Sequence, residues 1–325
     1  MLLETEPDGC REAARVVTIF LINRECPWRC TMCDLWKHTF PEATPSGWVS
    51  SQVHEALNRP EVVEWISTSP AECWVKLYNA GSFFDPRAIP LADQETIARE
   101  VRHFDRVVVE CHPRLVGAGV IKFKTLLKSG FSPPLPAQPS NTTPNAERSG
   151  PRLELALGLE TVEPHVLNRL NKGFEVRDFD RAADWIKQQD LDLRAFLLVQ
   201  PPFMDAAMTR KWTLRSVRHA VEQGARVVTL IPTRAGNGAM ESLAAQGLFT
   251  PPSLPLLETC LSDALNQTFR PAVILSDLWN LDEFSRCHHC LEARRQHLEN
   301  MNRTQRTSAP VLCPKCDASA DFPRE

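Results

Sequence analysis

Short hydrophobic runs alternate along the chain with segments of helical periodicity. Six runs rich in Val, Leu or Ile are nearly continuous, as expected for parallel strands that are covered on both faces. These runs are Arg15–Asn23, Cys73–Asn79, Arg106–Cys111, Leu153–Gly158, Leu193–Val199 and Arg226–Ile231. Between them, apolar residues recur every three or four positions, which predicts helices. The clearest helical segments are Leu91–Phe104, Phe179–Gln189 and Thr209–Gln223.

Six successive strand–helix units predict an α/β fold with a parallel sheet and right-handed crossovers. The pattern alone leaves open whether the sheet curls into a partial barrel or lies flat with helices on both faces. Residues 131–151 interrupt the series between the third and fourth units and contain six prolines among small polar residues. Such a segment cannot bury enough apolar surface to offset its ordering entropy. We therefore expect a mobile surface insertion there.

Composition narrows the class of protein. The 325 residues are 43% hydrophobic and 24% charged, which predicts a sizeable core. The formal net charge of −3 argues against a surface coated uniformly for nucleic-acid binding, although a local basic patch is compatible with it. No apolar run approaches the roughly 18–20 residues of a membrane helix. The acidic N-terminus lacks the basic and apolar regions of a secretory signal, so we expect a cytoplasmic protein.

Seven of the eleven cysteines stand at spacings typical of metal ligands. Cys26, Cys30 and Cys33 follow directly on the first predicted strand. Three thiolates in one short loop can hold three irons of a four-iron cluster and leave the fourth without a protein ligand. An open metal position is characteristic of catalytic rather than structural sites. The competing interpretation is a chance cluster or a structural zinc site.

A second group of cysteines lies near the C-terminus. Cys287 and Cys290 form one Cys-x2-Cys pair, and Cys313 and Cys316 form another. Two such pairs complete a tetrahedron, so we favour a structural zinc site over an auxiliary iron–sulfur cluster.

Arginines between the two pairs, including Arg294 and Arg295, are candidates for contacts with RNA phosphate, and the alternative is a solvated charged face.

The predicted division of the chain is an N-terminal extension over 1–14, a catalytic domain over 15–281 and a zinc-binding module over 282–325.

The spacing Cys-x3-Cys-x2-Cys resembles the signature of the radical S-adenosylmethionine enzymes. The resemblance implies a partial (β/α)6 barrel similar to a TIM barrel, with a 4Fe–4S cluster whose open iron binds S-adenosylmethionine. Reductive cleavage of S-adenosylmethionine then yields a 5′-deoxyadenosyl radical. This cleavage needs an electron donor such as a flavodoxin or ferredoxin. Met32 stands where the family usually has an aromatic residue near the adenine, and methionine can also pack on a purine face.

The same resemblance assigns roles at the ends of the later strands. Asn79, Gly81 and Ser82 match the element that binds the methionyl amino group, and Glu160 matches a ribose contact. Further cofactor or catalytic candidates at strand ends are Glu110, Gln200, Ile231 and Pro232. The structural alternatives are a tight turn at 79–82 and a helix cap at Glu160.

Longer stretches resemble one branch of the family, the radical subunit of archaeosine synthase, which is related to the radical domain of the Elongator catalytic subunit. They include Gly158–Thr161, Asn171–Gly173 and Arg234–Asn237. The resemblance implies cleavage of a carbon–nitrogen bond in a lysine-adducted deazaguanine, with tRNA and a partner subunit as partners. A radical enzyme for a small-molecule substrate, with a purely structural zinc module, is the alternative. A metal-binding interaction protein without catalysis is weaker, because it leaves the pattern at the strand ends unexplained.

Overall fold

The computed structural model describes residues 1–9, 13–68, 71–130, 150–267, 269, 271–285 and 287–317. Most of the predicted insertion, 131–149, lies outside these described residues. All six predicted strands are present, and a strand at each end of the sheet adds to them. The strands are β1 (Leu2–Glu6), β2 (Ala14–Leu21), β3 (Cys73–Asn79), β4 (Arg106–Cys111), β5 (Arg152–Glu160), β6 (Asp192–Val199), β7 (Ala225–Pro232) and β8 (Val273–Ser276).

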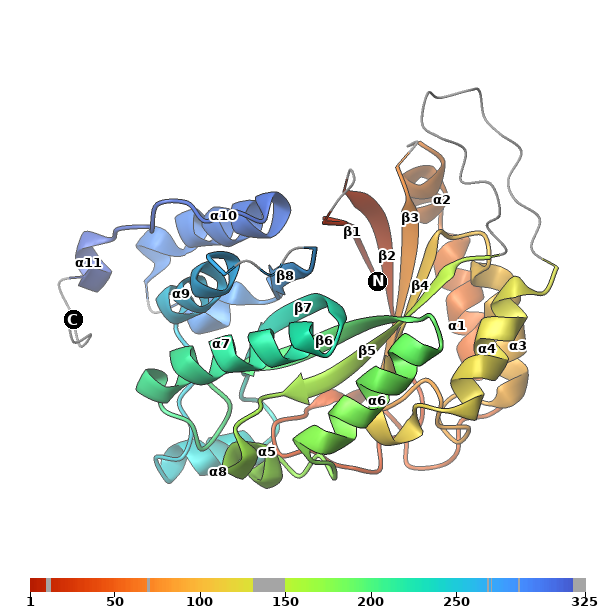
Figure 1. The fold of residues 1–325 in the computed structure, drawn as a ribbon, viewed down its shortest axis with the longest axis horizontal. Helices are drawn as coiled ribbons and strands as arrows, with labels where there is room; N and C mark the ends of the chain where they lie inside the picture. Colours follow the sequence, from red (N-terminus) through yellow and green to blue (C-terminus); the bar gives the residue numbers. More distant parts are fainter. Residues whose placement is uncertain are drawn as a thin grey trace.

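The sheet settles the question that the periodicity left open. Its strand order is β1-β2-β3-β4-β5-β6-β7-β8, with β1 antiparallel to β2 and every later pair parallel. A doubly wound sheet would reverse its strand order, whereas this order follows the chain throughout. The sheet therefore curls into a partial barrel, whose edges are β1 and β8 (Figure 1).

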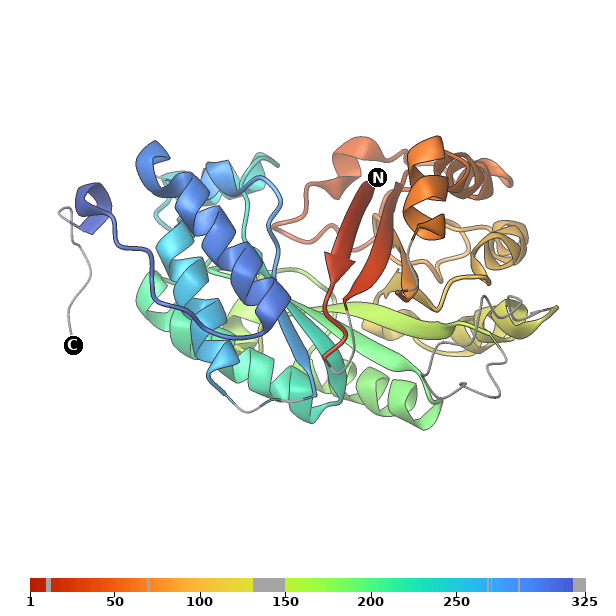
Figure 2. The same ribbon diagram turned by 90° about the horizontal axis from the view of Figure 1, so that it is seen from above.

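Helices cover the outer face of the curved sheet (Figure 2). The three helices predicted from periodicity are confirmed as α3, α6 and α7, each within a few residues of the expected limits. The α-helices are α1 (Trp48–Leu57), α2 (Pro60–Ser67), α3 (Leu91–Val101), α4 (Ala118–Lys128), α5 (Pro164–Arg169), α6 (Val176–Gln188), α7 (Ala206–Glu222), α8 (Ala239–Ala245), α9 (Leu254–Leu265), α10 (His288–Thr304) and α11 (Pro314–Asp317). None of the described helices is both long and apolar enough to cross a membrane.

Side chains alternate along each strand between two different environments. Residues such as Val75, Leu77 and Val107 point outward and form the main core with the helices. In contrast, Trp74 lies apart from this core, with Ala14 and Val16, on the inner face of the barrel.

Buried ion pairs fill part of the barrel interior near the N-terminal ends of the strands. Lys76 Nζ lies 2.6 Å from Glu6 Oε2, and Arg194 Nε lies 2.7 Å from Glu154 Oε1. Arg194 also pairs with Glu6. Because Glu6 belongs to β1, part of the predicted N-terminal extension is a strand that supplies charge to the barrel interior.

Candidate functional site

Cys26, Cys30 and Cys33 lie in the loop that leaves the carboxyl end of β2, where the active sites of β/α barrels occur. All three side chains are partly buried. Burial raises the pKa of each thiol, to about 12 for Cys33, so the free side chains are protonated at neutral pH. The loop turns through Arg29, whose φ is 49°, and the N–H of Cys33 donates to the carbonyl of Cys30 at 3.0 Å.

The loop after α5 holds the cysteine loop from one side. Asn171 Nδ2 donates to the carbonyl oxygens of Trp28 and Arg29 at 3.1 and 3.2 Å. The N–H of Thr31 donates to the Leu170 carbonyl at 3.0 Å. A Cβ atom at Gly173 would lie 2.6 Å from the Trp28 ring, so this position has room only for glycine. These contacts explain why the Asn171–Gly173 stretch stands out in the sequence.

Gly81 brings the turn after β3 against the first cysteine. Its φ is 106°, and a Cβ atom there would lie 3.2 Å from the Cβ of Cys26 and 3.4 Å from its sulfur. The Ser82 hydroxyl accepts a hydrogen bond from the N–H of Phe84 at 3.3 Å, so it supports the same turn. The chain therefore turns at Gly81 in direct contact with Cys26.

Two polar residues lie beside this turn. The Glu110 carboxylate accepts a hydrogen bond from the N–H of Asn79 at 2.9 Å. Burial nevertheless raises the pKa of Glu110 to about 8. Asn79 is buried, and its Oδ1 has no hydrogen-bond partner among the described residues. Cys111, in contrast, packs in the hydrophobic core as a buried thiol.

Glu160 and Lys172 form an ion pair that the sequence did not predict. Lys172 Nζ lies 2.5 Å from Glu160 Oε1, and their side chains are only 12% and 8% exposed. Gly158 provides the space, because a Cβ atom there would lie 2.7 Å from the ammonium nitrogen. The helix cap suggested as an alternative for Glu160 is formed instead by Glu163, which accepts the N–H of Val166.

The remaining predicted cofactor contacts line the adjacent strand ends. Met32 and Ile231 pack against the same small apolar cluster, whose buried members include Leu170 and Leu198. Pro232 pairs with Val199 at the ends of β6 and β7.

Backbone strain also collects at this end of the barrel. Glu160, Gln200 and Phe203 have φ angles of 65°, 54° and 71°, which non-glycine residues seldom adopt. Strained backbone of this kind clusters at functional sites.

The donor set around Cys26 fits an iron–sulfur cluster. Three sulfurs come from a single loop, and they do not crowd together as the ligands of one metal ion would. The turn at Gly81 lies beside the first of these sulfurs, and the unpartnered oxygen of Asn79 belongs to a residue two positions before Gly81.

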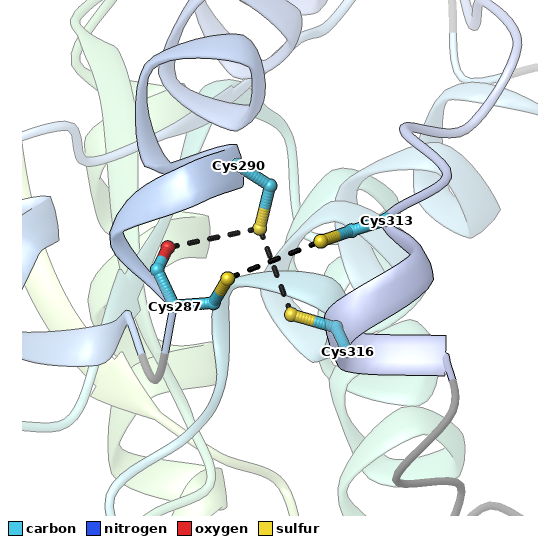
Figure 3. A group of neighbouring side chains, drawn as sticks. All are labelled: Cys287, Cys290, Cys313 and Cys316. Carbon is cyan, nitrogen blue, oxygen red and sulfur yellow. Dashed lines mark hydrogen bonds between the residues drawn. The ribbon is translucent and has the colours of Figure 1, made fainter.

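The four C-terminal cysteines form a compact group (Figure 3). The sulfurs of Cys287 and Cys313 are 3.9 Å apart, and those of Cys290 and Cys316 are 3.7 Å apart. All four sulfurs lie within 4.8 Å of one another. In a tetrahedron with metal–sulfur bonds of about 2.3 Å, neighbouring sulfurs are about 3.8 Å apart. The group therefore fits one tetrahedral metal ion, whereas the ligands of a multi-iron cluster would be spread farther apart.

Arg294 belongs to the surroundings of this metal site, which corrects its interpretation as an RNA contact. Its side chain is 4% exposed, and its Nε donates to the Cys290 sulfur at 3.3 Å. It also pairs with Glu258 of α9, which contacts His297 Nδ1 at 2.9 Å. A guanidinium committed to a thiol and a buried carboxylate is not available to phosphate. The helical spacing of α10 turns Arg294 inward, whereas Arg295 is about one third exposed.

A cavity of about 950 Å³ extends from the carboxyl end of β6 to the four-cysteine group. Gln200 and Phe203 line one side, and Cys287, Cys290 and Cys316 line the other. The guanidinium of Arg169 stacks on the Phe203 ring at 3.5 Å, on the first of these sides. The volume of this cavity is in the range of pockets that hold small molecules or nucleotides. The second metal group therefore lines a cavity that also reaches a predicted cofactor contact.

Comparisons with known proteins agree with this geometry. No protein-family model matches the chain. Archaeosine synthase subunit beta of Methanosarcina acetivorans is 24% identical over 250 residues, which cover 74% of this chain and 64% of that protein. The chain thus spans slightly less than two thirds of that relative. An uncharacterized protein of Methanocaldococcus jannaschii is 21% identical over 316 residues, or 93% of this chain and 79% of the relative.

Among solved structures, Elp3 of Methanocaldococcus infernus, in a form with an N-terminal deletion, matches with a TM-score of 0.52. The match covers 88% of this chain and 63% of that chain at 11% identity, so it bears on the fold alone. The partial barrel agrees with this match. The chain has the fold of the radical S-adenosylmethionine enzymes and is a distant homologue of archaeosine synthase subunit beta.

Proposed function

We propose that this chain is a radical S-adenosylmethionine enzyme that modifies a nucleoside of tRNA. The proposed reaction is cleavage of a carbon–nitrogen bond in a deazaguanine–lysine adduct, or a closely related step. One observation carries this proposal: the three-cysteine loop leaves the first parallel strand of a barrel in a chain related to archaeosine synthase subunit beta over 74% of its length.

In this proposal Cys26, Cys30 and Cys33 hold the 4Fe–4S cluster. With the cluster and S-adenosylmethionine bound, the site would supply a 5′-deoxyadenosyl radical that removes a hydrogen atom from the substrate. The unpartnered Oδ1 of Asn79 is suited to accept a hydrogen bond from the methionyl ammonium, close to Gly81. The remaining roles are an adenine site at Met32, Ile231 and Pro232, and polar contacts from Ser82, Glu160 and Gln200.

A chain of aromatic rings supports a planar substrate. Phe20 of β2 lies 6.3 Å from Trp279, which follows β8, and the two rings are inclined by only 21°. They are 48% and 58% exposed. Tyr78 and Phe196 continue the series into the barrel, with ring centroids 5.8 Å apart. Exposed ring faces of this kind can stack on a nucleobase, typically with about 1–3 kcal/mol per base.

We assign the four-cysteine group as a structural zinc site, within a C-terminal module over 282–325. The sulfur separations near the tetrahedral value support a single ion. Cys287 immediately precedes α10, and Cys313 immediately precedes α11. Backbone N–H groups of Cys316 and Lys315 lower the pKa of the Cys313 thiol, whereas burial and the neighbouring thiols raise the pKa of Cys316.

The first test concerns the cluster and the cofactor. Protein reconstituted anaerobically with iron and sulfide should show an oxygen-sensitive cluster and should release 5′-deoxyadenosine from S-adenosylmethionine when dithionite is added. Cys30→Ala should abolish that product, and Cys73→Ala should retain it, because Cys73 lies at the opposite end of its strand from the site. Wild-type yields from Cys30→Ala would refute the cluster assignment.

The second test concerns the substrate. The reconstituted enzyme is incubated with tRNA that carries the deazaguanine–lysine adduct, and the nucleosides are then analysed by mass spectrometry. Loss of the adduct mass together with formation of 5′-deoxyadenosine supports the proposal. An unchanged nucleoside profile, alongside active cleavage of S-adenosylmethionine, would favour a small-molecule substrate instead.

A further inference from the structure

Lys172 is a buried cation that stands among the groups of the candidate site. It extends from the loop after α5 into the barrel, where its ammonium pairs with Glu160 at 2.5 Å. The carbonyl of the same residue contacts His112 Nε2 at 3.0 Å, and its ammonium lies 5.7 Å from the Phe174 ring centroid. The neighbouring residue Asn171 ties this loop to the cysteine loop. The position of Lys172 relative to the cysteines is therefore held from both its backbone and its side chain.

The segment around Lys172 packs directly against the cysteine loop. A Cβ atom at Gly173 would lie 2.6 Å from the Trp28 ring, and the N–H of Thr31 donates to the Leu170 carbonyl. Burial alone would lower the pKa of Lys172, but the Glu160 carboxylate outweighs this effect and raises it. The side chain therefore stays protonated in the site, and its positive charge is permanent over the working pH range.

We propose that the Lys172–Glu160 pair sets the reduction potential of the iron–sulfur cluster bound by Cys26, Cys30 and Cys33. Reduction adds one electron, and hence one negative charge, to the cluster; the electron comes from dithionite or a protein electron donor. The Lys172 ammonium stabilises that added charge across a poorly solvated space, and Glu160 both positions the ammonium and offsets part of its charge. This inference rests on the cluster assignment of the proposed function.

The pair gives the inference a signature that structural damage would not produce. Lys172→Met leaves the Glu160 carboxylate unbalanced, which disfavours the reduced cluster. Glu160→Gln leaves the ammonium unbalanced, which favours the reduced cluster. The two variants should therefore shift the potential in opposite directions, and Lys172→Arg, which keeps the charge, should stay close to the wild type. A residue that merely supports the loop would not reverse the sign.

The experiment is a redox titration of the reconstituted full-length protein without S-adenosylmethionine, followed by electron paramagnetic resonance. At a fixed potential, Lys172→Met should lower the ratio of reduced to oxidised cluster about tenfold, which is about 59 mV for a one-electron couple. Glu160→Gln should raise the ratio by several-fold. Lys37→Met is the matched control, because Lys37 also lies near the cysteine loop but is exposed, so that water screens its charge.

The outcomes separate this inference from the proposed function. If the wild-type protein binds no cluster, the cluster assignment itself is wrong. If the wild-type protein binds a cluster and both variants keep its potential, or shift it in the same direction, the Lys172 inference is wrong and the proposed function is unaffected. Should Lys172→Met fail to bind iron, the titrations of Glu160→Gln and Lys172→Arg decide the question, because a raised and an unchanged potential are required of them.

Discussion

At the scale of single residues, Gly81 is the clearest case of a position that the site dictates. Gly81→Ala places a methyl group 3.2 Å from the Cβ of Cys26, on a backbone with a φ of 106°. We expect reduced iron binding after reconstitution, together with a loss of about 1–2 kcal/mol of unfolding free energy. Iron analysis and urea unfolding measure the two effects.

Gly224→Ala separates steric contact from backbone strain. Gly224 has a φ of 95°, but its added Cβ meets no described atom within 4 Å. This variant should lose similar stability and bind iron normally. Equal iron binding by both variants would show that the contact between Gly81 and Cys26 does not matter for the cluster.

Glu110 makes a prediction about pH. Its pKa is about 8 in the folded protein, because of burial, against an ordinary value of 4.5. Between these values the folded protein keeps a proton that the unfolded chain has lost, so the contribution of Glu110 to stability declines as the pH rises from 4.5 through 8. Glu110→Gln stays neutral and should therefore gain about 2–4 kcal/mol relative to wild type between pH 5 and pH 8.5. Urea unfolding measures this change. The same difference in unfolding free energy between Glu110→Gln and wild type at both pH values would contradict the prediction.

Local sequence identified some site residues and missed others for a physical reason. The cysteine motif and the turn at Gly81 could be identified because each lies within a few consecutive residues of the chain. The sequence assigns Lys172 no role, because its importance depends on Glu160, twelve residues earlier at the end of β5. Arg294 was assigned to RNA although its helix turns it toward Cys290. A charged residue can be located in the sequence, but its partner is set by the fold.

At the scale of secondary-structure elements, the strands were predictable where hydrophobic runs are long. The four-residue strand β8 is too short for such a run to stand out. The strand β1 reads LLETE, so its acidic residues resemble a solvated tail. The segment nevertheless forms a strand, because the Glu6 carboxylate forms ion pairs with Lys76 and Arg194 inside the barrel. That pairing spans up to 188 residues and leaves no local trace.

The α10 helix carries a prediction about the metal. Its first turn supplies Cys287 and Cys290, while Arg294 connects it to Glu258 of α9. Cys313→Ser should remove about one zinc per chain, lower the melting temperature and reduce amide protection over 288–304. Metal analysis and hydrogen exchange test this, with Cys73→Ser as the control that keeps the zinc. Loss of additional iron instead of zinc would indicate an auxiliary iron–sulfur cluster.

At the scale of the whole molecule, a single network of buried charges links strands from both halves of the sheet. The carboxylate oxygens of Glu154 in β5 lie 2.9 Å from a guanidinium nitrogen of Arg106, 2.7 Å from one of Arg194 and 2.7 Å from one of Arg226. The guanidinium groups of Arg106 and Arg226 also lie 5.0 and 4.9 Å from the Trp74 ring centroid. The network replaces the apolar filling that occupies the interior of many β/α barrels. Each arginine also pairs with a second carboxylate, Asp192, Glu6 or Asp8, so Glu154 is the group that joins three ion pairs into one network.

Glu154→Gln tests how far the stability of the barrel depends on this shared carboxylate. Burial raises the pKa of Glu154, but the three arginines outweigh it and hold the pKa below its ordinary value. The stabilisation is therefore complete above pH 4.5 and declines as the pH falls toward the folded pKa, with Glu6, whose pKa is about 2, declining in the same range. At pH 7 the variant should lose about 3–5 kcal/mol of unfolding free energy, because it removes the buried carboxylate that all three arginines share. Exposed Glu64→Gln is the control. A Glu154→Gln protein within 0.5 kcal/mol of wild type, a margin of about the size expected for surface changes, would mean that the network is not what holds the barrel together.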